Sequence, residues 1–303
     1  MTPANTVTLA QALRFWLKLG FISFGGPAGQ ISVMHRELVE ERRWISEQRF
    51  LHALNYCMLL PGPEAQQLAT YIGWLLHRTW GGIAAGVLFV LPSLLLLIGL
   101  SWVYVAYGQV GWVAGVLYGI KPAVAAIVVQ ALWRIGGKTL RHPAQTPLLW
   151  GIALVSFIAL YALSMPFPAV VLTAGLVGWV AVRWVPGQFV RPTAAHPVAA
   201  GGRPLGPALI DDQSPLPEHA RFGKGRLLRV VLVGALLWLL PMAALVAWQG
   251  WQGTLATMAT FFSKAALLTF GGAYAVLPYV YQGAVVEHSW LPGPQMIDGL
   301  ALG

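Results

Sequence analysis

The chain has 303 residues, of which 57% are hydrophobic and only 10% are charged, and its mean hydropathy is +0.66. Soluble domains carry about 25% charged residues, so this composition excludes an ordinary soluble protein and indicates an integral membrane protein. The formal net charge of +9 comes from loops between apolar stretches and not from one basic face with interleaved aromatics, which argues against a nucleic-acid partner.

Long uncharged stretches define the fold class. No charged side chain occurs from Thr79 to Ile120 or from His142 to Val182. Each stretch is about twice the roughly 20 residues that one membrane-spanning helix needs. Barrel strands would alternate in polarity over about 10 residues, and these stretches do not. The sequence therefore predicts an all-α, polytopic membrane protein.

Enzyme chemistry finds no support in the sequence. It contains no nucleophile triad, P-loop or metal motif, and its seven histidines show no ligand spacing, so no cofactor is expected. The single cysteine, Cys57, excludes an internal disulfide and is expected to be a small core residue. The segment from Met1 to Leu9 lacks the positive start of a cleavable signal peptide, so no removed segment is expected.

Two Gly/Pro clusters interrupt apolar sequence near the N-terminus. They are Phe24-Gly25-Gly26-Pro27 and Leu60-Pro61-Gly62-Pro63-Glu64. Proline lacks the N–H donor and glycine has little helical preference, so we expect a helix to break at both places. The apolar pieces 50–60 and 65–76 on either side of the second cluster each cover only about half the hydrocarbon thickness. They indicate a re-entrant hairpin or one broken span.

Five clear spans follow these pieces, and a polar linker divides them. The predicted spans are Gly82–Ala106, Val110–Trp133, Pro147–Leu163, Pro168–Val185 and Val230–Trp248. The linker, 186–229, holds seven prolines and too few apolar residues for a core, so a mobile loop is expected. The predicted domains are a first membrane repeat at 1–185, a cytoplasmic hydrophilic linker at 186–229, and an incomplete second membrane repeat at 230–303.

An internal repeat relates the two ends of the chain. A shift of 246 residues lays Phe15–Cys57 on Phe261–Gly303 without a gap and with nine identities. The identical pairs are Phe15/Phe261, Lys18/Lys264, Phe24/Phe270, Gly25/Gly271, Gly26/Gly272, Val39/Val285, Glu41/Glu287, Trp44/Trp290 and Leu54/Leu300. Several fall on rare residue types, so chance is a poor explanation. The chain stops before a second Pro-Gly-Pro, which predicts a truncated second copy.

Charge asymmetry predicts that the two copies are inverted. Lys and Arg cluster in 35–49, 134–141 and 186–229, which places these segments in the cytoplasm. The counterpart of the first segment, 281–295, has neither Lys nor Arg. An odd number of spans between the copies gives opposite orientations if each Gly-Gly stretch is a hairpin. If each stretch crosses fully, the copies are parallel and the missing cations have no explanation.

The Gly/Pro clusters are the strongest candidate for an anion site. A helix that begins inside the membrane presents free backbone N–H groups and the positive end of its dipole. Two such helix starts can converge on one anion, and glycine lets the backbone approach it closely. The alternative is that the clusters are only turns between ordinary helices. The Phe-Gly-Gly repeat in the second copy favours the anion site.

A few charged residues lie within apolar sequence. Lys18 near a helix end and Lys121 in mid-span indicate a transport pathway or an ion pair, with snorkelling as the alternative for Lys18. Glu64 is either an N-terminal helix cap or a proton carrier. The group of Glu37, Glu40, Glu41, Arg42 and Arg43 is most simply a solvated face with local pairing.

These motifs resemble the chromate ion transporter family. The matching residues are Phe24–Pro27, Glu40-Glu41-Arg42-Arg43-Trp44, Leu60–Gln66, Phe89-Val90-Leu91-Pro92-Ser93, Phe270-Gly271-Gly272 and Trp290. The resemblance implies a multi-pass protein of the bacterial inner membrane that expels chromate, a sulfate-like dianion, using the proton motive force. It also implies duplicated halves of opposite topology.

The resulting hypothesis is a proton-coupled oxyanion efflux transporter with broken helices around its substrate. Its partners would be chromate or a sulfate-like oxyanion, protons and the lipid bilayer, and a homodimer is left open. A permease for sulfate or another anion and a truncated, non-transporting remnant are the alternatives. The candidate substrate-binding residues are Gly25, Gly26, Pro27, Pro61, Gly62, Pro63, Glu64, Gln66, Lys18, Lys121, Gly271 and Gly272.

Overall fold

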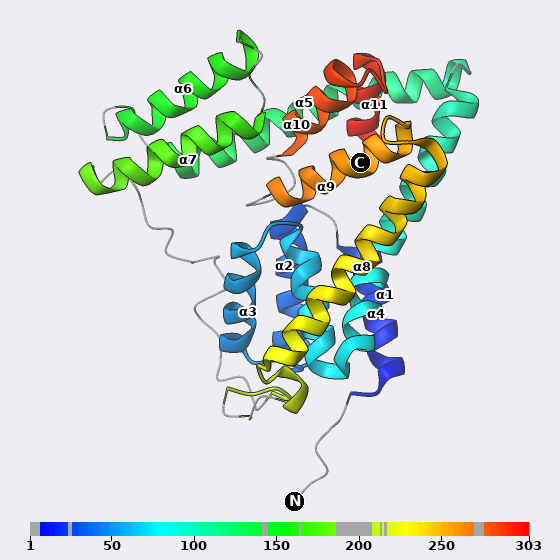
Figure 1. Cartoon of the computed structure of the whole chain (residues 1–303), viewed down its shortest axis with the longest axis vertical. Coiled ribbons are helices and arrows are strands. Elements are labelled where there is room, and N and C mark those ends of the chain that lie inside the picture. The colour runs from blue at the N-terminus through cyan, green and yellow to red at the C-terminus, as the bar shows by residue number, and fades with distance from the viewer. Residues whose placement is uncertain are drawn as a thin grey trace, which may run out of the picture. The chain divides into compact units, whose positions relative to one another are not determined.

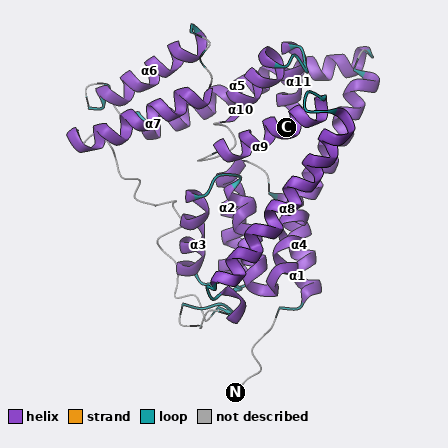
Figure 2. Cartoon of the chain, in the orientation of Figure 1, coloured by secondary structure: helices purple, strands orange, loops and turns teal. Residues whose placement is uncertain are grey.

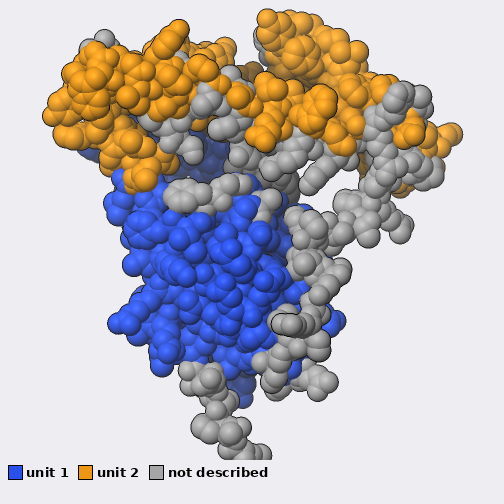
Figure 3. Space-filling view, turned by 180° about the vertical axis from the view of Figure 1, so that it is seen from behind, with its two compact units in different colours: residues 1–95, 197–276 blue, residues 96–196, 277–303 orange. Residues whose placement is uncertain are grey.

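The computed structural model describes residues 7–23, 26–108, 110–140, 143, 145–163, 165, 167–185, 208–212, 214, 217–269 and 276–302. In these residues the regular secondary structure is helical, and the predicted all-α class is confirmed (Figure 2). The chain divides into two compact units, one formed by 1–95 with 197–276 and the other by 96–196 with 277–303 (Figure 3).

The helices of the first unit begin with α1 (Leu9–Ile22), α2 (Gly26–His35), the π-helix η1 (Arg36–Glu41) and α3 (Glu47–Leu59). The start of α4 (Glu64–Tyr107), the short η3 (Glu218–Ala220), α8 (Lys224–Gln249) and α9 (Thr254–Leu268) complete it (Figure 1). The second unit holds the end of α4 together with α5 (Gly111–Thr139), α6 (Pro147–Tyr161), α7 (Phe167–Trp184), α10 (Leu277–Tyr281), the π-helix η5 (Gln282–Glu287) and α11 (Gly293–Leu302).

Apolar stripes at helical spacing build the core of the first unit. In α1 the buried apolar side chains are those of Ala12, Phe15, Trp16 and Leu19, and in α3 they are those of Phe50, Ala53, Leu54 and Cys57. Both sets follow the i, i+3, i+4, i+7 spacing of one helix face. The start of α4 adds Ala65, Leu68, Ala69, Ile72 and Leu75 to the same core. Cys57 is therefore a core residue, as expected.

The long helix α4 is two helices joined by a sharp reversal. His77 and Arg78 have non-helical backbone angles, and φ of Arg78 is 54°. The segments 64–76 and 79–107 then pack through glycines. A Cβ on Gly73 would lie 2.5 Å from the Cβ of Ala85 and 2.5 Å from the carbonyl oxygen of Gly81. Small residues let helix backbones approach this closely in membranes. The short piece 65–76 predicted from the sequence is confirmed as a separate helix.

Each of the five predicted spans lies almost wholly within one helix, from α4 to α8. By length and composition, α4 and α8 are long and apolar enough to cross a membrane, and shorter apolar helices include α6 and α9. Every residue of α8 from Val230 to Leu240 is exposed. An apolar helix with exposed leucines and valines is suited to contact with lipid.

The expectation of a mobile linker is wrong for its C-terminal part. Ile210 pairs with Ile45 in a parallel β-bridge and is buried in the core of the first unit. The N–H of Ser46 donates to the carbonyl oxygen of Ile210 at 3.0 Å, and the His219 ring lies 2.9 Å from the carbonyl oxygen of Trp74. One apolar side chain and several backbone bonds fix this segment, which composition averaged over 186–229 could not reveal. Residues 186–207 lie outside the described residues.

Candidate functional site

The first Gly/Pro cluster separates two helices, as the sequence predicts. The helix α1 ends at Ile22, and α2 begins at Gly26, whose φ of 72° lies in the left-handed region that favours glycine. The side-chain amide of Gln30 donates to the carbonyl oxygen of Ser23 at 3.3 Å and so closes the end of α1. Pro27 is half-buried. Phe24 and Gly25 lie outside the described residues.

The second cluster separates α3 from α4. Gly62 has φ of 116°, and a Cβ there would lie 2.9 Å from Nε2 of Gln67. That Nε2 donates to the carbonyl oxygen of Pro61 at 2.7 Å, so the side-chain amide of Gln67 stabilises the turn. The first residue of α4 is Glu64, which is only 7% exposed, whereas Pro63 is exposed and Gln66 is half-buried. The predicted break between α3 and α4 is confirmed.

A hydrogen bond connects this turn to the second copy of the repeat. The N–H of Gly62 donates to the carbonyl oxygen of Thr269 at 2.8 Å, and both residues belong to the first unit. Thr269 is buried at the end of α9, and its hydroxyl donates back to the carbonyl oxygen of Ala265 at 2.7 Å. The turn of the first copy therefore lies against the segment that precedes Phe270-Gly271-Gly272. These three residues lie outside the described ones.

The two copies share local backbone structure as well as sequence. With the shift of 246, α1 corresponds to α9, the π-helix η1 to η5, and the start of α3 to that of α11. Arg43 and its counterpart Ser289 both have positive φ, 56° and 50°. The bond from Trp44 N–H to Leu38 O, at 2.9 Å, has its counterpart from Trp290 N–H to Ala284 O, at 2.8 Å. The duplication is therefore structural.

A charge cluster around the buried Glu37 connects α1 to η1, and sequence reasoning missed it. The side chain of Glu37 is only 3% exposed; it lies 2.7 Å from Nζ of Lys18 and 3.2 Å from Nε of Arg42. The guanidinium of Arg42 also stacks on Phe15 and Trp44, with 4.9 and 5.4 Å to the ring centroids. The prediction that this charged group is a solvated face is thus wrong for Glu37, because the π-helix turns it inward. Lys18 forms an ion pair, one of the two roles predicted for it.

The electrostatics of Glu37 favour its ionised form. Burial raises the pKa of Glu37, but the hydrogen bonds and positive charges of Lys18 and Arg42 together outweigh burial and hold the pKa below its ordinary value of 4.5. A group with a lowered pKa stabilises the fold above its unfolded-state pKa. That contribution is lost as the pH falls through the folded-state value.

We expect Glu37→Gln to lower the free energy of unfolding at pH 7 by about 1–3 kcal/mol, less than for a fully buried pair because Lys18 is half exposed. The difference from the unchanged chain should begin to shrink as the pH falls below the ordinary value of 4.5, and it should be lost once the pH passes the lower pKa of Glu37 in the folded chain. Thermal unfolding in detergent across this pH range measures it. Glu41→Gln is the control, since Glu41 is 56% exposed and its ion pair with Arg36 is longer, at 3.6 Å. If the difference in unfolding free energy between the variant and the unchanged chain were the same at all pH values, Glu37 would not be the ionised partner of Lys18 and Arg42.

A second polar group on the same segment centres on His35. Its ring is buried, with Nδ1 3.1 Å from Glu40 and Nε2 2.8 Å from Glu47. In the second unit, the hydroxyl of Tyr104 donates to the buried carboxylate of Asp298 at 2.9 Å. Neither group was singled out from the sequence. An acid within the apolar end of α11 was the available signal for Asp298.

Several of the predicted site residues take no part in the polar contacts described above or lie outside the described residues. Lys121 lies in α5 of the second unit, and its side chain is outside the described residues. Gly25, Gly271 and Gly272 also lie outside them. Gly62, Glu64 and Gln66 belong to one turn and helix start, and Lys18 lies in α1 against η1.

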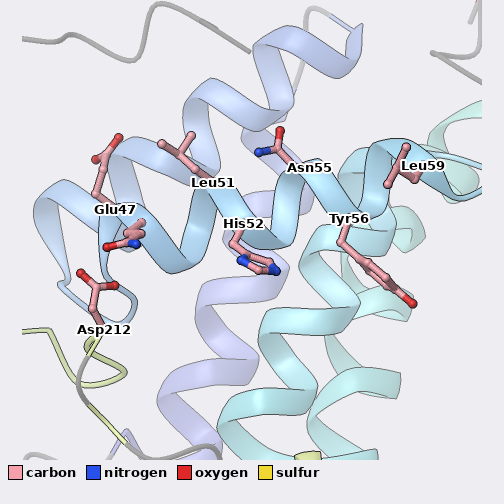
Figure 4. Close-up of a pocket in the computed structure, with 8 residues that line it drawn as sticks. Glu47, Leu51, His52, Asn55, Tyr56, Leu59 and Asp212 are labelled. Atoms are coloured by element: carbon pink, nitrogen blue, oxygen red, sulfur yellow. The ribbon is translucent and has the colours of Figure 1, made fainter. Parts of the chain in front are cut away.

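A surface groove of about 630 Å³ runs along α3 but does not hold the predicted residues. Its lining consists of Glu47, Gln48, Leu51, His52, Asn55, Tyr56, Leu59 and Asp212. Figure 4 shows Glu47 and Asp212 at one end of the groove and Leu59 at the other. Two carboxylates at one end repel an anion, so this groove is a poor oxyanion site.

Duplicated helices interrupted by Gly/Pro breaks are typical of one class of proteins, the helical membrane transport proteins. A family model described as "Chromate transporter" matches residues 10–179 and 256–303. The second matched stretch starts 246 residues after the first, which is the offset of the internal repeat. The chain belongs to the chromate transporter family, and its membrane character follows from that membership.

Curated relatives agree with this assignment. The chain is 32% identical to the "Chromate transport protein" of Cupriavidus metallidurans over 99% of its own length and 64% of the relative. It is 35% identical to the protein of the same name from Pseudomonas aeruginosa, over 95% of the chain and 60% of the relative. The chain is 30% identical to the "Probable chromate transport protein" of Synechococcus elongatus, over 97% of the chain and 65% of the relative. The chain thus spans less than two thirds of these relatives. No solved structure matches it.

Proposed function

We propose that this protein exports chromate or a closely similar tetrahedral oxyanion across a bacterial inner membrane, driven by the proton motive force. The similarity to proteins named for chromate transport supports the substrate. The observation that carries the site is the bond from Gly62 N–H to the Thr269 carbonyl oxygen, which connects the second Gly/Pro cluster to the end of α9 in the second copy. Oxyanions bind where backbone N–H groups converge at helix starts.

In this proposal the starts of the broken helices bind the oxyanion, and a nearby acid couples its transport to protons. Gly26 with Pro27 opens α2, and Pro61-Gly62-Pro63 precedes α4, so the N–H groups of a helix's first turn follow directly after each cluster. The prolines have no N–H and the Gly62 N–H is bonded to Thr269, so the donors at the second cluster are those of Glu64 and the residues after it. Glu64 is the titratable group closest in sequence to this site. Moving a dianion out of a negative interior is electrically downhill by roughly 4.6 kcal/mol per 100 mV, and a proton carried inward adds to that drive.

Everted membrane vesicles test the proposed activity. Vesicles that contain the chain and respire on NADH should take up labelled chromate faster than vesicles without it, and an uncoupler should abolish the difference. Excess sulfate should compete for uptake, because it has the same shape and charge. Uptake of sulfate alone would favour a sulfate permease. No uptake of either ion would overturn the proposal.

We also propose that the repeat is inverted in the membrane. In a Cys57→Ser background, single cysteines at Gly253 and Ser289 should react with an impermeant thiol reagent on intact cells. A cysteine at Arg42 should react only after lysis or in everted vesicles, because the Arg-rich segment is cytoplasmic. Reaction at Ser289 only after lysis would make the copies parallel.

A further inference from the structure

The two copies of the repeat carry a lysine at the same position but surround it differently. Lys18 lies in α1 and Lys264 at the corresponding position of α9. Both are in apolar helices, where a charge is costly and normally marks a pair or a pathway. The helices of the two copies match one another residue by residue, so the side chains that differ between them can be read from the aligned sequences.

In the first copy the lysine is used to compensate a buried acid. Nζ of Lys18 donates to Glu37 at 2.7 Å, and that carboxylate is 3% exposed. A buried carboxylate that loses a cationic partner is strongly destabilising. The charge of Lys18 is therefore compensated within the fold by Glu37.

In the second copy the corresponding acid is missing. Gly283 takes the place of Glu37, and His288 takes that of Arg42. His288 stacks on Trp290, with 4.5 Å between ring centroids and 15° between planes. Within the described residues of the first unit, Lys264 is exposed and forms no ion pair. Its charge has no compensating carboxylate from the repeat.

The helix that carries Lys264 also reaches the turn at Gly62. Thr269, at the end of α9, accepts the N–H of Gly62 at 2.8 Å. Lys264 is five residues earlier, about 7.5 Å along the helix axis. We propose that Lys264, and not Lys18, is the lysine that binds the oxyanion beside the Pro61-Gly62-Pro63 turn. This inference rests on the proposed function and assigns the cation of its site.

Equilibrium dialysis of labelled sulfate against the purified full chain in lipid nanodiscs tests the assignment. Lys264→Gln should weaken sulfate binding by roughly 10- to 100-fold, the effect of losing a charge-assisted hydrogen bond, whereas Lys264→Arg should retain most of it. Lys18→Gln is the matched control. This substitution should lower the thermal midpoint of unfolding but change the affinity for sulfate by less than about twofold.

Chemical rescue separates a binding role from a structural one. Lys264→Cys in the Cys57→Ser background should bind sulfate weakly, and modification with an aminoethyl thiol reagent should restore binding by restoring the ammonium. The same treatment of Lys18→Cys should leave sulfate affinity unchanged. Sulfate is the probe because chromate oxidises thiols. Undiminished binding by Lys264→Gln would overturn this assignment alone, whereas no binding by the unchanged chain would overturn it together with the proposed function.

Discussion

Gly62→Leu is expected to abolish transport of the oxyanion and to reduce its binding at least about tenfold, because three features of the turn fail together. The φ of 116° is strained for any residue with a Cβ, at a cost of about 1–3 kcal/mol. The new side chain would meet Nε2 of Gln67 at 2.9 Å and displace the amide from Pro61. The shifted backbone would also lose the bond from Gly62 N–H to Thr269.

Controls separate this effect from a general loss of folding. Gly99→Leu in α4 should be neutral, because Gly99 is exposed and nothing lies within 4 Å of a Cβ built there. Gly26→Leu should resemble Gly62→Leu, since φ of Gly26 is 72° and its N–H begins α2. Sulfate binding, chromate uptake and membrane insertion are measured on all three variants. If both Gly26→Leu and Gly62→Leu showed full chromate uptake at equal expression, the Gly/Pro clusters would be only turns between helices and not part of the anion site.

Glu64→Gln is expected to remove transport driven by a pH gradient while sulfate binding remains. Glu64 is 7% exposed and occupies the first turn of α4, directly after the turn that contacts Thr269. The amide keeps the size and shape of the carboxyl group but cannot take up or release the coupled proton. Reconstituted vesicles with an imposed pH gradient, and equilibrium dialysis of sulfate on the same protein, measure the two effects separately.

The alternative role of Glu64 as a helix cap predicts a different result. Gln is a poorer cap, so the free energy of unfolding would fall by about 1 kcal/mol while coupling survived. Glu64→Asp preserves the titrating group and should keep part of the pH-driven transport. Undiminished transport by Glu64→Gln would remove Glu64 from the mechanism. The proton carrier would then be sought at Glu41 or through lysine chemistry at Lys121.

The sequence by itself determined the helices, the two breaks and the family. Hydropathy placed the five spans because lipid-exposed and core helices are built from the same uninterrupted apolar residues. Proline and glycine placed the breaks after Ile22 and Leu59 because their effects act on their own backbone and the adjacent turn. The repeat was visible because rare residues recur at a fixed offset.

Only the tertiary structure decided which residues meet. The burial of Glu37 against Lys18, 19 residues away, depends on the π-helix and on the packing of α1 against α2, and composition made the same segment look solvated. Ile210 joined the core although its linker is polar on average. The contact from Gly62 to Thr269 joins segments separated by more than 200 residues. Such pairings arise from the packing of distant segments, so local patterns in the sequence do not encode them in a form that can be read directly.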